Sequence, residues 1–185
     1  MLPNDENAII SPCYVRSGPM FTRVVDMTTD PRDEAHLRRC VELAREAMAD
    51  GDGPFGSVLA GPDGEVLAED RNRETSTSDP TAHPEFALAQ WAARHLPPET
   101  RAAATVYTSG EHCPMCAAAH AWVGLGRIVY AASSAQLAGW RAGWGLPAAP
   151  VAVLPITAIA PGIVTAGPVP PFDEEMRQLH ERAAG

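Results

Sequence analysis

The side chains best suited to chemistry in this sequence are two cysteines and one histidine, each at the start of an expected helix. Cys113 and Cys116 stand three residues apart in the motif Cys-Pro-Met-Cys, so both thiols lie on one face of a first helical turn. A helix N-terminus favours anions and lowers the pKa of a thiol, which makes these thiolates available to a metal ion. By itself, the motif suits a redox-active pair equally well.

A histidine and a glutamate favour the metal over the redox pair. His83, Pro84 and Glu85 lie 30 residues before the cysteine motif, where a proline fits the first turn of a helix because no N–H is needed there. His83 and the two cysteines give Zn²⁺ three ligands, and the open fourth position of such a site holds water. Glu85 is close enough to carry a proton. The pattern predicts hydrolytic deamination, in which water displaces an amino group from a ring carbon and ammonia leaves.

Three other uses of these residues stay open at this stage. A structural zinc site needs a fourth ligand, which His112 or His120 could supply, since His120 lies four residues after Cys116 on the same helical face. A redox pair would leave His83 and Glu85 without a role. A zinc-stabilised binding module without catalysis would keep the ligands and make no use of Glu85.

Composition and charge exclude several classes of function. The chain has 185 residues and a formal net charge of −9, and all 14 of its basic residues are arginines. Without lysine, Schiff-base chemistry, pyridoxal-phosphate attachment and a Walker phosphate loop are excluded. The acidic balance disfavours a nucleic acid, because phosphate neutralisation needs a basic face. A small heterocyclic base or nucleoside is therefore the expected partner.

The sequence gives no sign of a membrane span or a secretory signal. No stretch approaches the ~18 consecutive apolar residues that a bilayer requires, and Asp5 and Glu6 stand where a signal peptide has positive charge. We therefore expect a cytoplasmic protein with reduced thiols. Residues 1–31 show no sustained periodicity and are expected to form an N-terminal extension, which leaves residues 32–185 as the catalytic domain.

Apolar periodicity and turn signals predict an alternation of helices and strands around these residues. Helices are expected over residues 33–50, 84–96, 113–123 and 174–184, and strands over 55–60, 65–68, 105–108, 127–132 and 151–154. This order predicts an α/β fold, a three-layer α/β/α sandwich with a central five-stranded mixed sheet. The glycine-rich run 139–145 is expected to be a loop, and 160–171 a surface connection.

These motifs together resemble the zinc-dependent cytidine deaminase superfamily, and more closely its branch of guanine deaminases and tRNA adenosine deaminases. The resemblance extends from about residue 33 to residue 132. Within that range it rests on the motif Gly-Pro-Phe-Gly at 53–56, the stretch 79–85 and the stretch 108–116. It implies a cytidine deaminase-like fold, a homodimer, and His83, Cys113 and Cys116 as zinc ligands. It also implies that Glu85 is the catalytic proton shuttle.

The same resemblance suggests which residues contact the substrate. Asn72 matches an asparagine that hydrogen-bonds the base, and Trp122 falls where guanine deaminases have a tryptophan near the pocket. Phe55 belongs to the Gly-Pro-Phe-Gly motif. Trp140, like Trp144, could close a flat ring against an aromatic face or could simply anchor its loop. We therefore predict that Phe55, Asn72, Pro84, Trp122 and Trp140 bind the substrate.

Three departures from the family pattern bear on the substrate. Pro84 replaces an alanine whose N–H donates to the substrate, and proline has no N–H to give. His112 replaces the proline usual before the first cysteine. Arg141 lies in a stretch where guanine deaminases have an acidic pair. These departures leave the predicted chemistry intact. They widen the range of expected substrate rings beyond guanine itself.

The sequence therefore predicts a zinc-dependent hydrolytic deaminase that releases ammonia from an amino-substituted heterocyclic base. The expected ring is a guanine-like purine or a related small ring such as cytosine or an aminotriazine. A tRNA-specific adenosine deaminase is the first alternative, and the non-catalytic zinc-stabilised binding module is the second.

Overall fold

Five strands form one mixed sheet in the computed structural model, which describes residues 31–185. The strand order is β2-β1-β3-β4-β5. Strand β1 (Gly56–Ala60) is antiparallel to β2 (Val66–Arg71) and to β3 (Thr105–Gly110), and the sheet continues through β4 (Arg127–Ala132) and β5 (Thr165–Ala166), both parallel to β3. The extension predicted for residues 1–31 lies, up to residue 30, outside the described residues.

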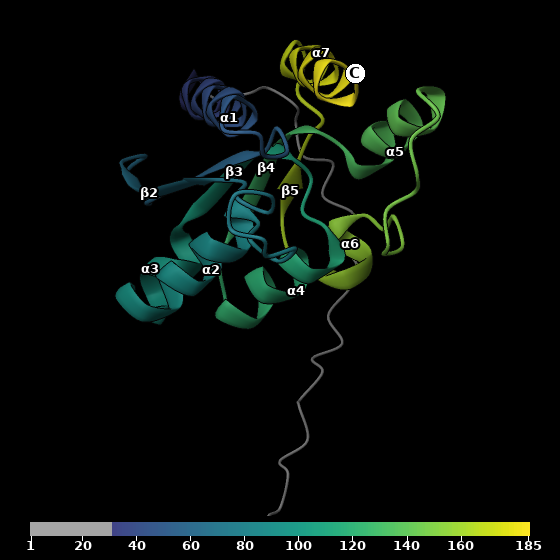
Figure 1. The fold of residues 1–185 in the computed structure, drawn as a ribbon. Helices are drawn as coiled ribbons and strands as arrows, with labels where there is room; N and C mark the ends of the chain where they lie inside the picture. The colour runs from purple at the N-terminus through teal and green to yellow at the C-terminus, as the bar shows by residue number, and fades with distance from the viewer. Residues whose placement is uncertain (1–30) are drawn as a thin grey trace, which may run out of the picture.

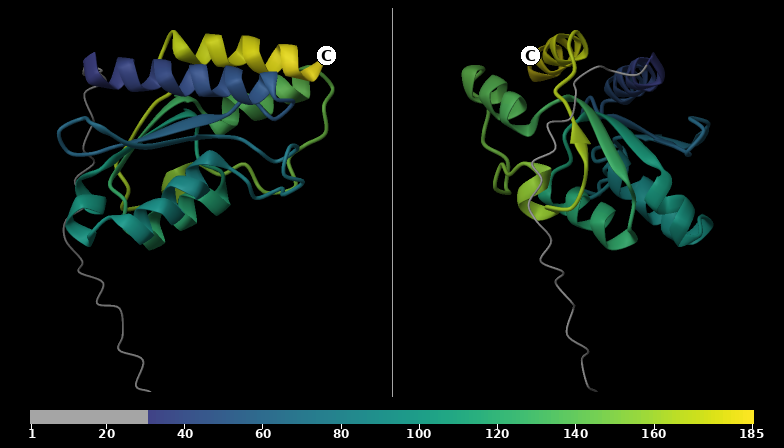
Figure 2. Two further views of the ribbon diagram at one scale, coloured as in Figure 1. Left: turned by 60° about the vertical axis from the view of Figure 1, so that its left-hand side comes forward. Right: turned by 180° about the vertical axis from the view of Figure 1, so that it is seen from behind.

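Helices cover both faces of this sheet, as the order of elements predicted (Figures 1 and 2). On one face, α1 (Pro31–Ala49) and α7 (Phe172–Ala184) lie side by side, with α5 (Ser134–Gly143) next to α7. The opposite face carries α2 (Pro84–His95), α3 (Pro98–Ala103), α4 (Pro114–Val123) and α6 (Ile156–Ile159). The three-layer α/β/α architecture is therefore confirmed. None of the helices within residues 31–185 is both long and apolar enough to cross a membrane.

Each helical layer buries an apolar stripe against the sheet. In α1, Leu37, Val41 and Ala44 recur at helical spacing and are fully buried with the α7 residues Phe172 and Met176. On the other face there is a second cluster. It includes side chains from β1, α2 and β3: Leu59, Leu88, Ala89, Ala92 and Val106. Ala119 and Val123 of α4 pack against the second cluster, which therefore holds α2 and α4 together on this face of the sheet.

The predicted strand over 151–154 is wrong. Residues 151–154 have no regular structure, and the fifth strand is β5, inside the stretch that was expected to be only a surface connection. Pro150 and Pro155 flank the segment, and proline lacks the N–H that a sheet ladder requires. Val151 and Val153 are 49% and 48% exposed, so this apolar run is not a core strand.

Candidate active site

Two helix starts meet at the three predicted metal ligands. His83 is the N-cap of α2 and Cys113 is the N-cap of α4, and each is followed by a proline. The Nδ1 atom of His83 lies 3.7 Å from Sγ of Cys113 and 3.6 Å from Sγ of Cys116. A nitrogen and a sulfur bound tetrahedrally to one Zn²⁺ lie about 3.5–3.6 Å apart, given Zn–N and Zn–S bonds of about 2.0–2.1 and 2.3 Å. The three ligand atoms, all within 4.8 Å of one another, therefore fit a zinc ion.

The ligand side chains are electrostatically coupled: the hydrogen bond between the two thiols raises the pKa of Cys116, and contacts with Cys113 and Glu74 raise the pKa of His83 to about 10. A hydrogen bond from the Cys116 thiol, together with the adjacent His83, lowers the pKa of Cys113 to about 4. A thiolate is the form that binds zinc. Neither His112 nor His120 belongs to the ligand group found among the described residues. Those two rings instead pack edge to face 5.3 Å apart, both buried, so the structural zinc site with a histidine as fourth ligand receives no support.

A carboxylate that the sequence analysis missed orients the histidine. Oε1 of Glu74 lies 3.3 Å from Nε2 of His83, which leaves Nδ1 facing the thiols. The Glu74 Oε2 atom accepts from Nδ2 of Asn72 at 2.7 Å, and the Glu74 N–H donates to Oδ1 of Asn72 at 3.0 Å. A carboxylate on the far nitrogen of a metal-binding histidine fixes the tautomer and the ring orientation. Asn72, predicted to bind the base, thus also holds this carboxylate in place.

Glu74→Ala is expected to weaken zinc binding by roughly 10–100-fold, the usual effect of losing such a partner. Glu74→Gln should lower the zinc affinity much less, because the amide oxygen of glutamine can still accept a hydrogen bond from His83. Competition with a chromophoric zinc chelator measures both affinities without relying on turnover. Equal zinc affinity in Glu74→Ala and the unaltered chain would contradict the positioning role.

Glu85 lies where a proton carrier is needed, in the first turn of α2 and 6% exposed. Its Oε1 accepts a 2.8 Å hydrogen bond from the Thr108 hydroxyl, which itself accepts one of 2.9 Å from Ser57. Burial raises the pKa of Glu85, while the Thr108 bond stabilises the carboxylate. The opposing effects suit a group that takes up and returns a proton.

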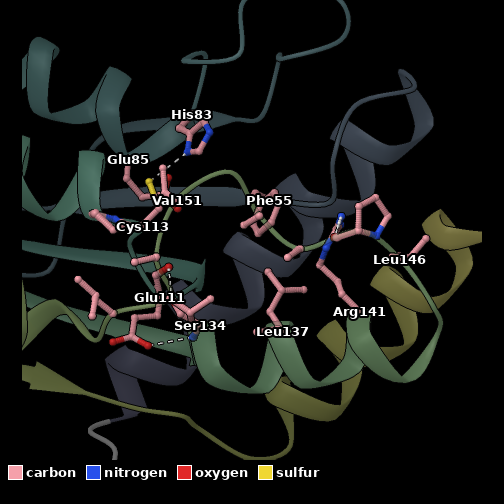
Figure 3. Close-up of a pocket in the computed structure, with 18 of the residues that line it drawn as sticks. Phe55, His83, Glu85, Glu111, Cys113, Ser134, Leu137, Arg141, Leu146 and Val151 are labelled. Carbon is pink, nitrogen blue, oxygen red and sulfur yellow. Dashed lines mark hydrogen bonds between the residues drawn. The ribbon is translucent and has the colours of Figure 1, made fainter.

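Two of the ligands, His83 and Cys113, line a cavity of about 250 Å³ together with Glu85 (Figure 3). Phe55, Asn72 and Pro84 also line it. The remaining walls come from one face of α5 and from the segment 146–154. In Figure 3, Leu146 and Arg141 lie at the end of the group away from His83 and Glu85. The cavity therefore has His83 and Glu85 at one end, and we call the wall formed by α5 and the segment 146–154 its outer wall.

The loop predicted over 139–145 is wrong for residues 139–143, because these residues belong to helix α5. The helix begins with a capping box in which Ser133 and Gln136 each bond the other's backbone, a signal present in the sequence as Ser-x-x-Gln. Helical spacing aims Leu137 and Arg141 into the cavity. Trp140 falls on another face, against the main core and 6.4 Å from the ring of His180. Trp140 therefore does not line the cavity.

Trp122 also lies away from the cavity of the described chain. It is the residue before the last in α4 and is 92% exposed. Within residues 31–185, Trp122 is therefore not part of the cavity lining.

Glu111 is a further residue whose role the sequence did not reveal. Its carboxylate accepts from the backbone N–H of Ser134 at 2.9 Å and of Ile156 at 3.0 Å. These are the first residues of α5 and α6, so one side chain anchors both ends of the segment that forms the outer wall. Anions are stabilised at helix N-termini, which explains the arrangement.

Comparison with known proteins agrees with this geometry. Residues 30–132 match the family described as the cytidine and deoxycytidylate deaminase zinc-binding region. The match covers more than half of the chain, and the chain belongs to this family. Family and ligand geometry together define a zinc-dependent hydrolytic deaminase that acts on heterocyclic bases, with zinc as its cofactor.

Individual relatives point to more than one substrate. The guanine deaminase of Bacillus subtilis (strain 168) is 39% identical over 106 residues, which cover 57% of this chain and 67% of that relative. A tRNA-specific adenosine deaminase of Haemophilus influenzae is 35% identical over 101 residues, 55% of this chain and 58% of that relative.

Solved structures give the same fold. The structure of the Bacillus subtilis guanine deaminase has a TM-score of 0.51 at 38% identity and covers 57% of this chain and 68% of its own. A structure of guanine deaminase from Nitrosomonas europaea, at 21% identity, has a TM-score of 0.66 and covers 86% of this chain and 87% of its own. At that identity the second likeness supports the fold alone.

Proposed function

We propose that this enzyme releases ammonia from a free amino-substituted heterocyclic base, either a guanine-like purine or a small ring such as cytosine or an aminotriazine. The observation that carries the proposal is that Glu85 and the ligands His83 and Cys113 line one cavity of about 250 Å³. A cavity of this size, with mostly apolar walls, suits a single flat ring.

The chain's own residues divide the work of the reaction. When bound, zinc supplies Lewis-acid activation of a water molecule. Glu85 takes a proton from that water and delivers it to the ring nitrogen beside the amino-bearing carbon. The oxygen forms a bond to this carbon, a second proton passes through Glu85 to the amino group, and the carbon–nitrogen bond breaks to release ammonia. Thr108 keeps the Glu85 carboxylate aimed at the site through its 2.8 Å bond.

A tRNA-specific adenosine deaminase is the competing proposal, favoured by the relative from Haemophilus influenzae. The net charge of −9 opposes it, because binding to a polyanion depends on phosphate neutralisation. Half-buried arginines of α1 and α7 are moreover paired with acidic side chains, as in Arg39–Glu69 and Arg177–Glu174.

Ammonia release from the zinc-loaded enzyme tests the two proposals together. The panel contains guanine, cytosine, adenine, aminotriazines, their nucleosides and a tRNA anticodon stem-loop. We expect turnover of at least one free ring and none of the RNA. Deamination of the RNA with no free ring consumed would reverse the ranking.

Pro84→Ala is expected to shift the choice among rings. The substitution adds a backbone N–H at a residue that lines the cavity, and an unpaired buried acceptor costs about 1–3 kcal/mol. Rings with a carbonyl, such as guanine and cytosine, should therefore gain roughly 5- to 150-fold in relative kcat/KM over rings without one. Unaltered relative rates would show that Pro84 does not set specificity.

We also propose a cytoplasmic homodimer whose catalytic domain spans residues 32–185. Thiolate zinc ligands suit a reducing compartment, and the described cysteines Cys40, Cys113 and Cys116 are free. The 92% exposure of Trp122 makes α4 the proposed dimer surface, since large exposed aromatics favour interfaces. Trp122→Ser is expected to raise the fraction of monomer in sedimentation velocity, and a monomeric unaltered chain would contradict the dimer.

A further inference from the structure

The outer wall of the cavity is aliphatic. Helix α5 contributes Leu137 and Ala138, and the segment 146–154 contributes Leu146, Val153 and Leu154. Val153 and Leu154 are 48% and 38% exposed, although side chains of this kind are usually buried. Covering an apolar surface that residues 31–185 leave exposed to solvent with an apolar group is favourable in free energy.

Several polar side chains along the cavity have hydrogen-bond partners within the protein. Both ends of the Asn72 amide bond Glu74, and both oxygens of Glu111 accept backbone N–H groups. Arg141 donates from Nη2 to the carbonyl of Pro147 at 3.1 Å, which ties the wall segment to α5 (Figure 3). Pro84 brings no N–H. Most of the cavity lining is apolar.

We infer that the preferred substrate is an amino-substituted heteroaromatic ring that carries an apolar alkyl or aryl substituent, and that this substituent covers the aliphatic wall formed by Leu137, Val153 and Leu154. This inference rests on the proposed function and narrows it. The reacting edge of the ring faces Glu85, and the substituent lies against the aliphatic wall.

A graded series of rings tests the inference. The rings are 2,4-diamino-1,3,5-triazines with hydrogen, methyl, isopropyl or phenyl at carbon 6, and with amino or carboxylate there as polar counterparts. Each has the same leaving group. We expect kcat/KM for ammonia release to rise at least about tenfold from hydrogen to isopropyl, since even one methylene in an apolar pocket has an effect of that order. Equal values across the series, or a preference for the amino or carboxylate ring, would overturn the inference.

Binding to the zinc-loaded Glu85→Gln variant separates this inference from the proposed function. Calorimetry on this variant gives the dissociation constant of each ring without any turnover. Ammonia release without an apolar preference rejects the inference alone. An apolar preference in binding with no ammonia from any ring rejects deamination and leaves the apolar preference standing. If no ring binds and no ring releases ammonia, both the inference and the proposed function are rejected.

A matched pair of variants locates the effect on α5. Leu137→Asn places an amide in the wall and should lower the isopropyl-to-hydrogen ratio at least about fivefold. Ala135→Asn, at an exposed position of the same helix, should leave the ratio unchanged. If Leu137→Asn does not fold, Val153→Ser tests the same wall from a segment without regular structure. An unchanged ratio in the folded wall variant would contradict the inference.

Discussion

Glu85→Gln is expected to lower kcat roughly 10²–10⁴-fold, the usual contribution of a positioned acid–base group. The substitution keeps the shape of the side chain and an oxygen for the Thr108 hydroxyl, which lies 2.8 Å from Oε1. An amide cannot accept the proton of the attacking water and return it to the ring and the amine. Steady-state ammonia release with the best ring of the panel measures the loss.

Zinc content distinguishes this loss from damage to the metal site. Glu85 is not among the three ligands that the geometry brings together, so mass spectrometry should find the same zinc per chain in Glu85→Gln and the unaltered enzyme. Glu99→Gln, on the exposed part of α3, is the matched control and should retain full activity. Substantial turnover by zinc-loaded Glu85→Gln would remove Glu85 from the mechanism.

The residues at the centre of the site could be predicted because their geometry is local in the sequence. A proline after His83 and another after Cys113 indicate where α2 and α4 begin, and Cys116 follows on the first turn of α4. The structure needs only to bring two helix starts together, which the packing of α2 and α4 over the sheet achieves. Contiguous motifs thus carry most of the information about the metal centre.

The residues that were missed depend on contacts between distant segments. Glu74 reaches His83 only through the turn that follows β2, in which the backbone N–H groups of Thr75 and Ser76 both donate to Asp52. Nothing in the spacing of a single segment indicates that arrangement. Glu111 likewise gains its role from two helices that come later in the chain.

The outer wall was misjudged for a different reason. Gly139 and Gly143 suggested a loop, yet the capping box at Ser133 and the packing of Trp140 on the main core are compatible with a helix that contains both glycines. The apolar alternation over 151–154 has the pattern of a strand, but its side chains line the cavity. A binding surface and a buried strand can share one hydrophobic pattern, and only the tertiary structure separates them.

Cys116→Ala is expected to release the zinc. Structural zinc in zinc-finger peptides is bound with an apparent free energy on the order of 10–16 kcal/mol. With only three protein ligands to hold the ion here, loss of one should weaken the affinity at least roughly 10²–10³-fold. Dialysis against a moderate chelator should leave about one zinc per chain in the unaltered enzyme and almost none in the variant. Activity should fall with the metal.

Cys40→Ala provides the matched control, since Cys40 is a buried free thiol in α1 that lies outside the ligand group. Its zinc content should equal that of the unaltered chain even if burial makes the substitution destabilising. Thermal unfolding adds a second measurement: a ligand that binds only the folded state raises Tm, so an excess of a strong chelator that strips the zinc should lower Tm in the unaltered enzyme and in Cys40→Ala. In Cys116→Ala chelator should have almost no effect, because little zinc is bound to remove. Full zinc occupancy in Cys116→Ala would mean that Cys116 is not a zinc ligand and that the three-ligand site is wrong.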